Sequence, residues 1–237
     1  MTPVVVPVSP VPATADPDPS LSIDLRDPYI AACLAWLIPG AGHFYQRRWG
    51  KGGLFMVCIL GTFFMGLWMG QGRVVYASWR HNDQRYAYFC QLGVGLPALP
   101  ALVQAFRMGS GQPRAPLFDG MMAPPLMPGQ LVPGDWAEQQ VAAGEFDRED
   151  FPDLAEQPRP TYVSYLYAPK DREPAGDPYN QLSAWNFKMG AFFELGTVYT
   201  LIAGLLNVLA IYDAWGGPVL PPVDPSGDTD EKDVKKS

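Results

Sequence analysis

Long apolar stretches alternate with polar, Pro-rich stretches along the chain. Four apolar stretches come close to the length of about 20 residues that a helix needs to cross a bilayer core, namely residues 29–46, 52–70, 86–106 and 191–215. Apolar residues are gathered in these stretches, whereas a water-soluble domain would spread them at helix or strand spacing. The pattern therefore predicts an all-α membrane protein with four transmembrane helices, of which residues 28–106 supply three.

The first two stretches are predicted to form a helical hairpin. Asp27 and Pro28 make a good helix start, with Asp as N-cap and Pro in the first turn. Residues 52–70 carry no charge and are the strongest membrane signal in the chain. Pro39 is expected to break the hydrogen-bond ladder near the far end of the first stretch, where Gly40 and Gly42 allow the backbone to bend. The connection between the two stretches is short, so we expect a tight turn.

The third and fourth stretches carry a few polar residues. Two prolines and two glutamines weaken the third as a membrane helix: Pro97, Pro100, Gln91 and Gln104. Prolines are tolerated in such helices where neighbouring groups satisfy the freed carbonyls. The fourth has charges only near its ends, where a charged side chain can reach the membrane surface.

Residues 107–190 differ from the apolar stretches in being polar and rich in proline. They contain twelve prolines, twelve acidic residues and seven basic residues. We expect one short helix between Asp135 and Gly144, too little apolar material for an independent core, and a long, largely irregular loop. The ends of the chain, residues 1–27 and 216–237, are expected to be disordered tails.

Composition excludes several classes of function. The net charge is −7 and no basic face or arm is present, so we expect no nucleic acid as partner. The three cysteines lie in different apolar stretches and have the character of small buried hydrophobes. We predict no catalytic residue, no metal site and no cofactor, because no nucleophile–base pair or ligand cluster stands out.

Basic residues give only a weak orientation signal. The connections on both sides of residues 52–70 are basic, while the acidic N-terminal segment offers little to retain it in the cytoplasm. Arg107, Arg114 and Lys188 flank the long loop, which favours a cytoplasmic loop and both tails outside. With four spans, the connection at Arg47 and the long loop lie on the same side in either orientation.

The segment between the first two stretches is the best candidate site. Its residues are Pro39, Gly40, Gly42, His43, Phe44, Tyr45, Arg47, Arg48 and Lys51. Glycines let backbone N–H groups approach a ligand, the imidazole exchanges a proton near neutral pH, and the basic residues suit a lipid phosphate. The alternative, which is the commoner case in membrane proteins, is structural: close helix packing, interfacial aromatics and basic residues that set topology.

Polar and small residues of the fourth stretch predict contacts between helices. We expect Glu194 to pair with Arg47, Arg48 or Lys51, and Asn207 to form an interhelical hydrogen bond. Asp213 can pair with Arg73 or cap a helix end. Small residues at four-residue spacing allow close backbone approach. The candidate interhelical contacts are Glu194, Gly196, Gly204, Asn207 and Asp213.

Leu34 to Gly52 reads LAWLIPGAGHFYQRRWGKG. It combines a Gly-rich turn, a His/Phe/Tyr cluster and a basic, Gly-containing turn that enters a second helix. This segment resembles the signature of the two-helix membrane module called the TM-two domain. With residues 193–214, the chain resembles an uncharacterised four-pass bacterial membrane family. The resemblance covers the helices and not the long loop, and it implies the bacterial inner membrane without an activity.

Two functions remain open. The first is a non-enzymatic scaffold that binds a protein partner through the 107–190 loop, with Trp136, Phe146 and Phe151 as exposed aromatic anchors. The second is a lipid-handling protein with a headgroup site at His43, Tyr45, Arg47 and Arg48. Membrane lipids are expected partners in both cases.

Overall fold

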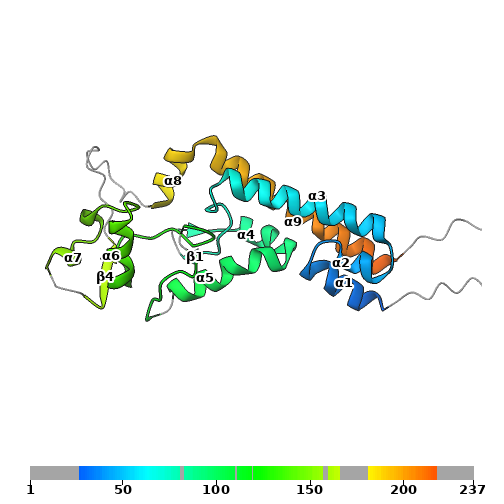
Figure 1. Cartoon of the computed structure of the whole chain (residues 1–237), viewed down its shortest axis with the longest axis horizontal. Helices are drawn as coiled ribbons and strands as arrows, with labels where there is room; N and C mark the ends of the chain where they lie inside the picture. Colours follow the sequence, from blue (N-terminus) through cyan, green and yellow to red (C-terminus); the bar gives the residue numbers. More distant parts are fainter. Residues whose placement is uncertain are drawn as a thin grey trace, which may run out of the picture.

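The computed structural model is mostly helical and describes residues 27–80, 83–109, 111–118, 120–156, 160–165 and 181–217. Nearly all of the two predicted tails lies outside these residues. Two long antiparallel helices, α3 (Trp49–Met69) and α9 (Ala191–Gly216), form the axis of the molecule (Figure 1). They occupy the second and fourth predicted stretches.

Glycines bring α3 and α9 together. A Cβ placed on Gly66 would lie 2.7 Å from the carbonyl oxygen of Gly196, and one placed on Gly196 would lie 2.6 Å from that of Gly66. The two backbones therefore touch where Gly66, near the end of α3, meets Gly196, near the start of α9. Such close approach increases the dispersion contact between the two helices.

The first predicted helix, residues 29–46, is broken and folds back on itself. It consists of α1 (Pro28–Leu37) and the short α2 (Ala41–Tyr45). Ile38, the residue before Pro39, is extended and ends α1, and Gly40, with φ +85°, is the left-handed N-cap of α2. Gly42 then lies against α1, because a Cβ there would overlap the carbonyl oxygen of Ala31. The sequence predicts the break at Pro39, but the expectation of a single spanning helix over residues 29–46 is wrong, because the chain folds back there.

The third predicted helix, residues 86–106, is broken in the same way. Its parts are α4 (Ala87–Gln91), η2 (Leu92–Val94), η3 (Leu96–Ala98) and α5 (Leu99–Gly109). The chain reverses at Gly95, which has φ +84° and is followed closely by Pro97. A Cβ on Gly95 would overlap the carbonyl oxygen of Trp36, so the tip of this hairpin meets the tip of the α1–α2 hairpin. In Figure 1 the two hairpins lie end to end below α3 and α9.

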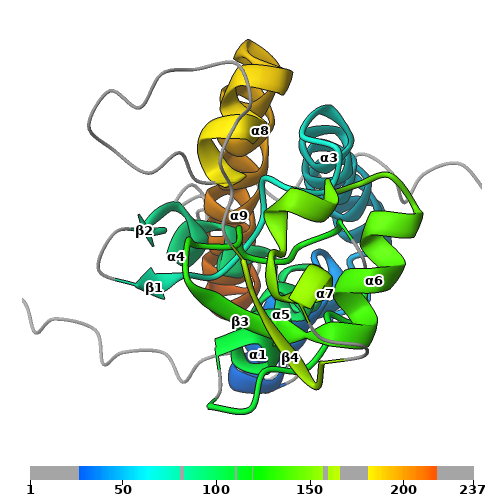
Figure 2. The same ribbon diagram turned by 90° about the vertical axis from the view of Figure 1, so that its left-hand side faces the viewer.

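The described part of the long loop contains a folded unit, here called the polar unit (described residues of 111–165). Its elements are β3 (Gln130–Pro133), α6 (Gly134–Ala142), η4 (Arg148–Asp150), α7 (Asp153–Glu156) and β4 (Tyr162–Tyr165). The two strands pair antiparallel, with Val132 opposite Val163. Figure 2 looks onto this end of the molecule, with α6 and α7 in front.

The polar unit has an apolar core that is separate from the main helical core. One residue at the end of α5 also contributes to it. Its buried side chains are Met108, Leu126, Val132, Trp136, Ala137, Phe151, Leu154, Val163 and Tyr165. The expectation of too little core material is therefore wrong for the described residues. Phe151 and Trp136 are core residues and not exposed anchors, because a few large aromatics replace many small apolar residues in so short a segment.

Buried polar side chains fasten the polar unit to the helices. The amide of Gln104, fully buried on α5, donates to the carbonyls of Phe118 and Met121 and accepts from the amide of Leu117. Arg80, in the small hairpin of β1 (Trp79–Arg80) and β2 (Asp83–Gln84), donates to Gln130 at 2.6 Å. The helix α8 (Gln181–Met189) completes this end and leads into α9.

This arrangement separates the basic turn around Arg47 from the polar unit. Since α1 and α2 fold back, the turn lies near the first and last described residues, at what is here called the terminal end of the molecule (Figure 1). The polar unit lies at the opposite end. The expectation that the turn and the loop share a side is wrong, because it assumes that every apolar stretch crosses the whole length of the bundle. Among the described residues, only α3 and α9 are long and apolar enough to cross a membrane.

We expect Gly66→Ala to destabilise the protein by about 1–3 kcal/mol, because the added methyl group overpacks the contact between α3 and α9. The matched control is Gly61→Ala on the same helix, where an added Cβ meets nothing within 4 Å. Thermal unfolding in detergent measures both. Equal melting temperatures for the two variants would contradict the close-packing role of Gly66.

Candidate functional site

Asp213, near the end of α9, pairs with basic side chains from α2, from the turn after it and from the first turn of α3. Its Oδ2 lies 2.7 Å from Nε2 of His43, 2.7 Å from Nζ of Lys51 and 3.4 Å from Nη2 of Arg48. Lys51 also donates to Oδ1 at 2.7 Å. One carboxylate thus joins α2, the following turn and the first turn of α3 to α9.

The turn between α2 and α3 wraps around the C-terminal end of α9. Arg47 has φ +60°, which lets the chain reverse within a few residues. The side chain of Gln46 donates to the carbonyl of Ala214 at 2.5 Å, and so satisfies one of the last carbonyls of the helix. Cations beside these carbonyls also interact favourably with the helix dipole.

His43 is the most enclosed member of this cluster. Its side chain is fully buried and its ring lies 4.8 Å from that of Phe55, centroid to centroid. Nε2 faces Asp213, whereas Nδ1 has no hydrogen-bond partner within the described part of the chain. The imidazole is thus oriented by one carboxylate and packed against one aromatic ring, an arrangement that suits a structural clamp.

The expected pairing of Glu194 with the basic turn is wrong. Glu194 is exposed in the first turn of α9, and α9 runs antiparallel to α3, so the basic turn meets the other end of that helix. Asp213 takes the role predicted for Glu194. Arg73, the other partner predicted for Asp213, lies beside Glu145 at 3.4 Å.

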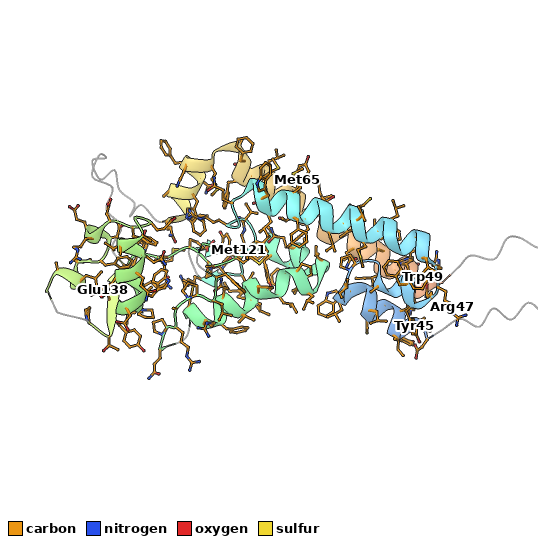
Figure 3. All side chains as sticks on the ribbon, in the orientation of Figure 1. Tyr45, Arg47, Trp49, Met65, Met121 and Glu138 are labelled. Carbon is orange, nitrogen blue, oxygen red and sulfur yellow. The ribbon has the colours of Figure 1, made fainter. Side chains whose placement is uncertain are left out.

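The other residues of the candidate segment serve packing or point outward. A Cβ on Gly40 would overlap the carbonyl oxygen of Gly52, and the ring of Phe44 covers Gly52. Phe44 also contacts Trp49, with ring centroids 5.5 Å apart. Arg47 is exposed and extends from the terminal end, near Tyr45 and Trp49 (Figure 3). The glycines Gly40, Gly42 and Gly52 therefore have no free space for a ligand at their α-carbons.

Asn207 joins the tips of both hairpins to α9. Its side chain is fully buried, and its Nδ2 donates to the carbonyls of Ala35 at 3.1 Å and Gly93 at 2.9 Å. Each acceptor lies near a helix end inside the structure, where carbonyls have no partner within their own helix. One turn earlier, Gly204 packs against the carbonyl of Cys90, which an added Cβ would overlap.

A polar cavity lies at the opposite end of the molecule, between the helices and the polar unit. Its volume is about 500 Å³, within the range of small-molecule sites. Arg73 and Lys188 supply positive charge to its wall, and Glu145 supplies negative charge. The wall also has aromatic, amide and further acidic groups, which come from Trp136, Phe146, Trp185, Gln71, Gln140, Asp147 and Asp150.

The sequence pattern does not reveal this cavity, because its walls come from segments far apart along the chain. The connection after α3, the polar unit and α8 each contribute two or more residues, and no local spacing pattern links them. The one available signal is the pair of basic residues, Arg107 and Lys188, that flank the loop; of these, Lys188 lines the cavity. Among the described residues, no group of three or more His, Cys, Asp and Glu side chains is placed to hold a metal ion.

Comparison with known proteins gives a family but no activity. The model of a family of unknown function, DUF6677, matches residues 30–225. The match spans both hairpins, both long helices and the polar unit. No curated protein and no solved structure matches the chain.

We expect Asp213→Asn to lower the stability of the protein by about 1–3 kcal/mol, because a neutral amide cannot replace the acceptor shared by His43 and Lys51. Glu194→Gln is the matched control, since it neutralises an exposed acid on the same helix. Thermal unfolding in detergent compares the variants. A double-mutant cycle should show coupling of Lys51 with Asp213 and none with Glu194; the reverse pattern would refute the assignment.

Proposed function

The chain belongs to DUF6677, a family of unknown function, and from this premise we propose that it is a non-enzymatic, multi-pass scaffold of the bacterial inner membrane. In this proposal the helices anchor the protein, and the polar unit binds a protein partner at one membrane face. The observation that carries the proposal is a folded, acidic unit fastened by hydrogen bonds to one end of an apolar helical assembly.

The exposed apolar faces of the long helices support the membrane placement. In the most apolar 18-residue segment of each helix, only 28 % of α3 and 33 % of α9 is buried within the protein. Val57 is 73 % exposed, Trp68 76 % and Leu209 65 %. Contiguous apolar surface of this extent favours contact with lipid over contact with water.

The two hairpins fit a membrane protein in which only α3 and α9 cross completely. Helix breaks at membrane depth are tolerated where protein groups satisfy the freed backbone, as Asn207 does for Ala35 and Gly93. All four apolar stretches then belong to the membrane part, with the hairpins entering from opposite faces. The resemblance of residues 34–52 to the TM-two domain supports a membrane location for this part of the chain, although α1 and α2 fold back where that module has a spanning helix.

Charge favours a cytoplasmic polar unit. The end that carries this unit holds six basic residues close to the membrane helices, which are Arg73, Arg80, Arg85, Arg107, Arg114 and Lys188. Within the part of the chain that the structure describes, the terminal end holds Arg47, Arg48 and Lys51, and the last two lie beside Asp213. By the positive-inside rule the tails and the Arg47 turn are then outside.

The composition of the polar unit favours a basic protein partner. Residues 120–156 contain eight Asp or Glu and one Arg. Asp135 and Glu138 are exposed on α6, and Glu138 points away from the molecule at the far end in Figure 3. Complementary charge on a partner would steer its approach and exclude acidic competitors.

The alternative headgroup site at the terminal end has less support. The sequence predicts that it uses His43, Tyr45, Arg47 and Arg48. His43 is buried against Asp213 and Arg48 lies beside the same carboxylate, so Arg47 is left as the exposed cation of that set. A single arginine provides bidentate contact with a phosphate but no surrounding cradle.

The proposed topology predicts that Gly50 and Glu138 lie on opposite sides of the membrane. Gly50→Cys and Glu138→Cys, each made after replacement of Cys33, Cys58 and Cys90 by Ala, place single thiols at exposed positions. We expect a membrane-impermeant maleimide to label position 50 in intact spheroplasts and position 138 only after lysis. Labelling of both positions on one side would exclude this topology.

The scaffold predicts a discrete partner at α6. A photo-cross-linking amino acid at Gln139, which is exposed beside Glu138, should give one defined adduct in cells. We expect Glu138→Lys to reduce that adduct several-fold by charge repulsion, and Glu138→Gln to reduce it less. The same cross-linker at Leu209 is the control for lipid-facing positions. If neither substitution changes the yield of the adduct, the acidic surface of α6 does not bind the partner.

A further inference from the structure

A second hollow lies directly beside the polar cavity. It is an apolar groove of about 500 Å³ between the last turns of α3 and the first turns of α9. Its lining residues are Met65, Trp68, Met69, Gln71, Phe192 and Tyr199. Gln71 lines the polar cavity as well, so the two hollows adjoin at this residue.

The two hollows have opposite character. The groove is lined by thioether and aromatic side chains at the end of the apolar helical pair, and Met65 lies on its outer surface in Figure 3. The cavity offers charged and amide groups beyond the end of α3. A ligand that fills both must therefore be apolar at one end and charged at the other.

We propose that the joined hollows bind one glycerophospholipid with a zwitterionic, ammonium-bearing headgroup. An acyl chain would lie in the groove, and the headgroup would enter the cavity past Gln71. This inference rests on the membrane placement of the proposed function but not on a protein partner, because the two hollows do not include the exposed residues Gln139 and Glu138.

The charges of the cavity suit a headgroup of both signs. Nη2 of Arg73 lies 3.4 Å from Glu145, a loose pair that can open to separate partners. The phosphate would lie between Arg73 and Lys188, which both line the cavity, since guanidinium binds phosphate in bidentate fashion. The ammonium would then face Glu145 and the aromatic walls, which attract cations through their ring faces.

Aromatic packing holds Arg73 in place for this role. Its guanidinium carbon lies 5.3 Å from the ring centroid of Trp185, and 18 % of its side chain is exposed. Gly72, just before it, accepts from the amide of Met122 at 2.7 Å, which ties the cavity floor to the polar unit. The cation is thus positioned before a ligand arrives, which reduces the entropy lost on binding.

The test uses the full chain in a lipid-free detergent and dioleoyl phosphatidylethanolamine added in mixed micelles. Retained lipid is measured by native mass spectrometry, and stabilisation by thermal unfolding. We expect one retained lipid per chain in the wild type. Lys188→Gln changes an exposed side chain and Arg73→Gln a partly buried one, and each should weaken binding about tenfold by the loss of a charged hydrogen bond.

Matched variants show whether the lipid is retained in the joined hollows or elsewhere on the protein. Arg47→Gln neutralises an exposed cation at the terminal end and should leave lipid retention unchanged. Met65→Trp should fill the groove and reduce retention while the chain keeps its melting temperature in detergent alone. Soluble phosphoethanolamine is the second probe, and we expect no comparable stabilisation from it.

Each contrary outcome overturns the inference. Retention that is lost with Arg47→Gln and kept with Lys188→Gln would move the site to the terminal end. Equal stabilisation by phosphoethanolamine would make the occupant a free zwitterion. No retained lipid in the wild type would refute the site, while the maleimide and cross-linking results would still decide the topology and the scaffold.

Discussion

Two helices of this structure are interrupted, and the backbone carbonyls exposed at the breaks need hydrogen-bond donors. The rest of the structure depends on this constraint. α1 ends at Leu37, and Gly95, after α4, lies against Trp36 of α1. Gly93 lies against Gly204, in the middle of α9. Carbonyls left open there would each cost several kcal/mol in an apolar environment. Asn207 satisfies one carbonyl from each hairpin, and small residues on the same helix let the hairpins come close enough for it to do so.

That constraint gives the molecule two different ends. Because both hairpins stop midway, the terminal end is formed by the α1–α2 hairpin and the opposite end by α4, α5 and the polar unit. At the terminal end, Asp213 neutralises the neighbouring cations and Gln46 covers a helix carbonyl, so little binding capacity remains. At the opposite end, Arg73 and Lys188 line an open cavity whose charges are only partly paired.

This asymmetry relates the structure to its proposed function. A membrane scaffold needs one rigid anchor and one surface that remains available. The closely packed α3–α9 pair and the carboxylate clamp provide rigidity, while the acidic face of α6 and the cavity beside it provide accessible chemistry. A bound lipid at the junction would link the anchoring of the helices to the position of the polar unit, because Arg73 and Gly72 belong to the segment that touches both.

Local physical chemistry determined several features from the sequence alone. The uncharged run at residues 52–70 and the run at 191–215 are long apolar helices, since helix length and apolarity are properties of a contiguous segment. The start at Asp27–Pro28 was likewise predictable, because Asp27 accepts from the amide of Tyr29 and a cap acts within a few positions. The short helix near Asp135 was also predicted, but it begins at Gly134 without a side-chain cap, so the signal of a cap at Asp135 was wrong. The segment around Pro39 and Gly40 clearly signalled a bend, although the sequence did not show how far the chain would fold back.

Tertiary structure alone decided the pairings. Nothing local distinguishes Glu194 from Asp213 as the partner of Lys51, and the choice follows from the antiparallel packing of α9 on α3 with a folded hairpin beside them. The break at Gly95 depends on the carbonyl of Trp36, a residue far earlier in the chain. The core of the polar unit and the cavity at Arg73 likewise need segments that meet only after folding. A residue pattern reflects conformational preferences within a few positions of the chain. These contacts instead depend on which distant backbone segments pack closely together once the chain has folded.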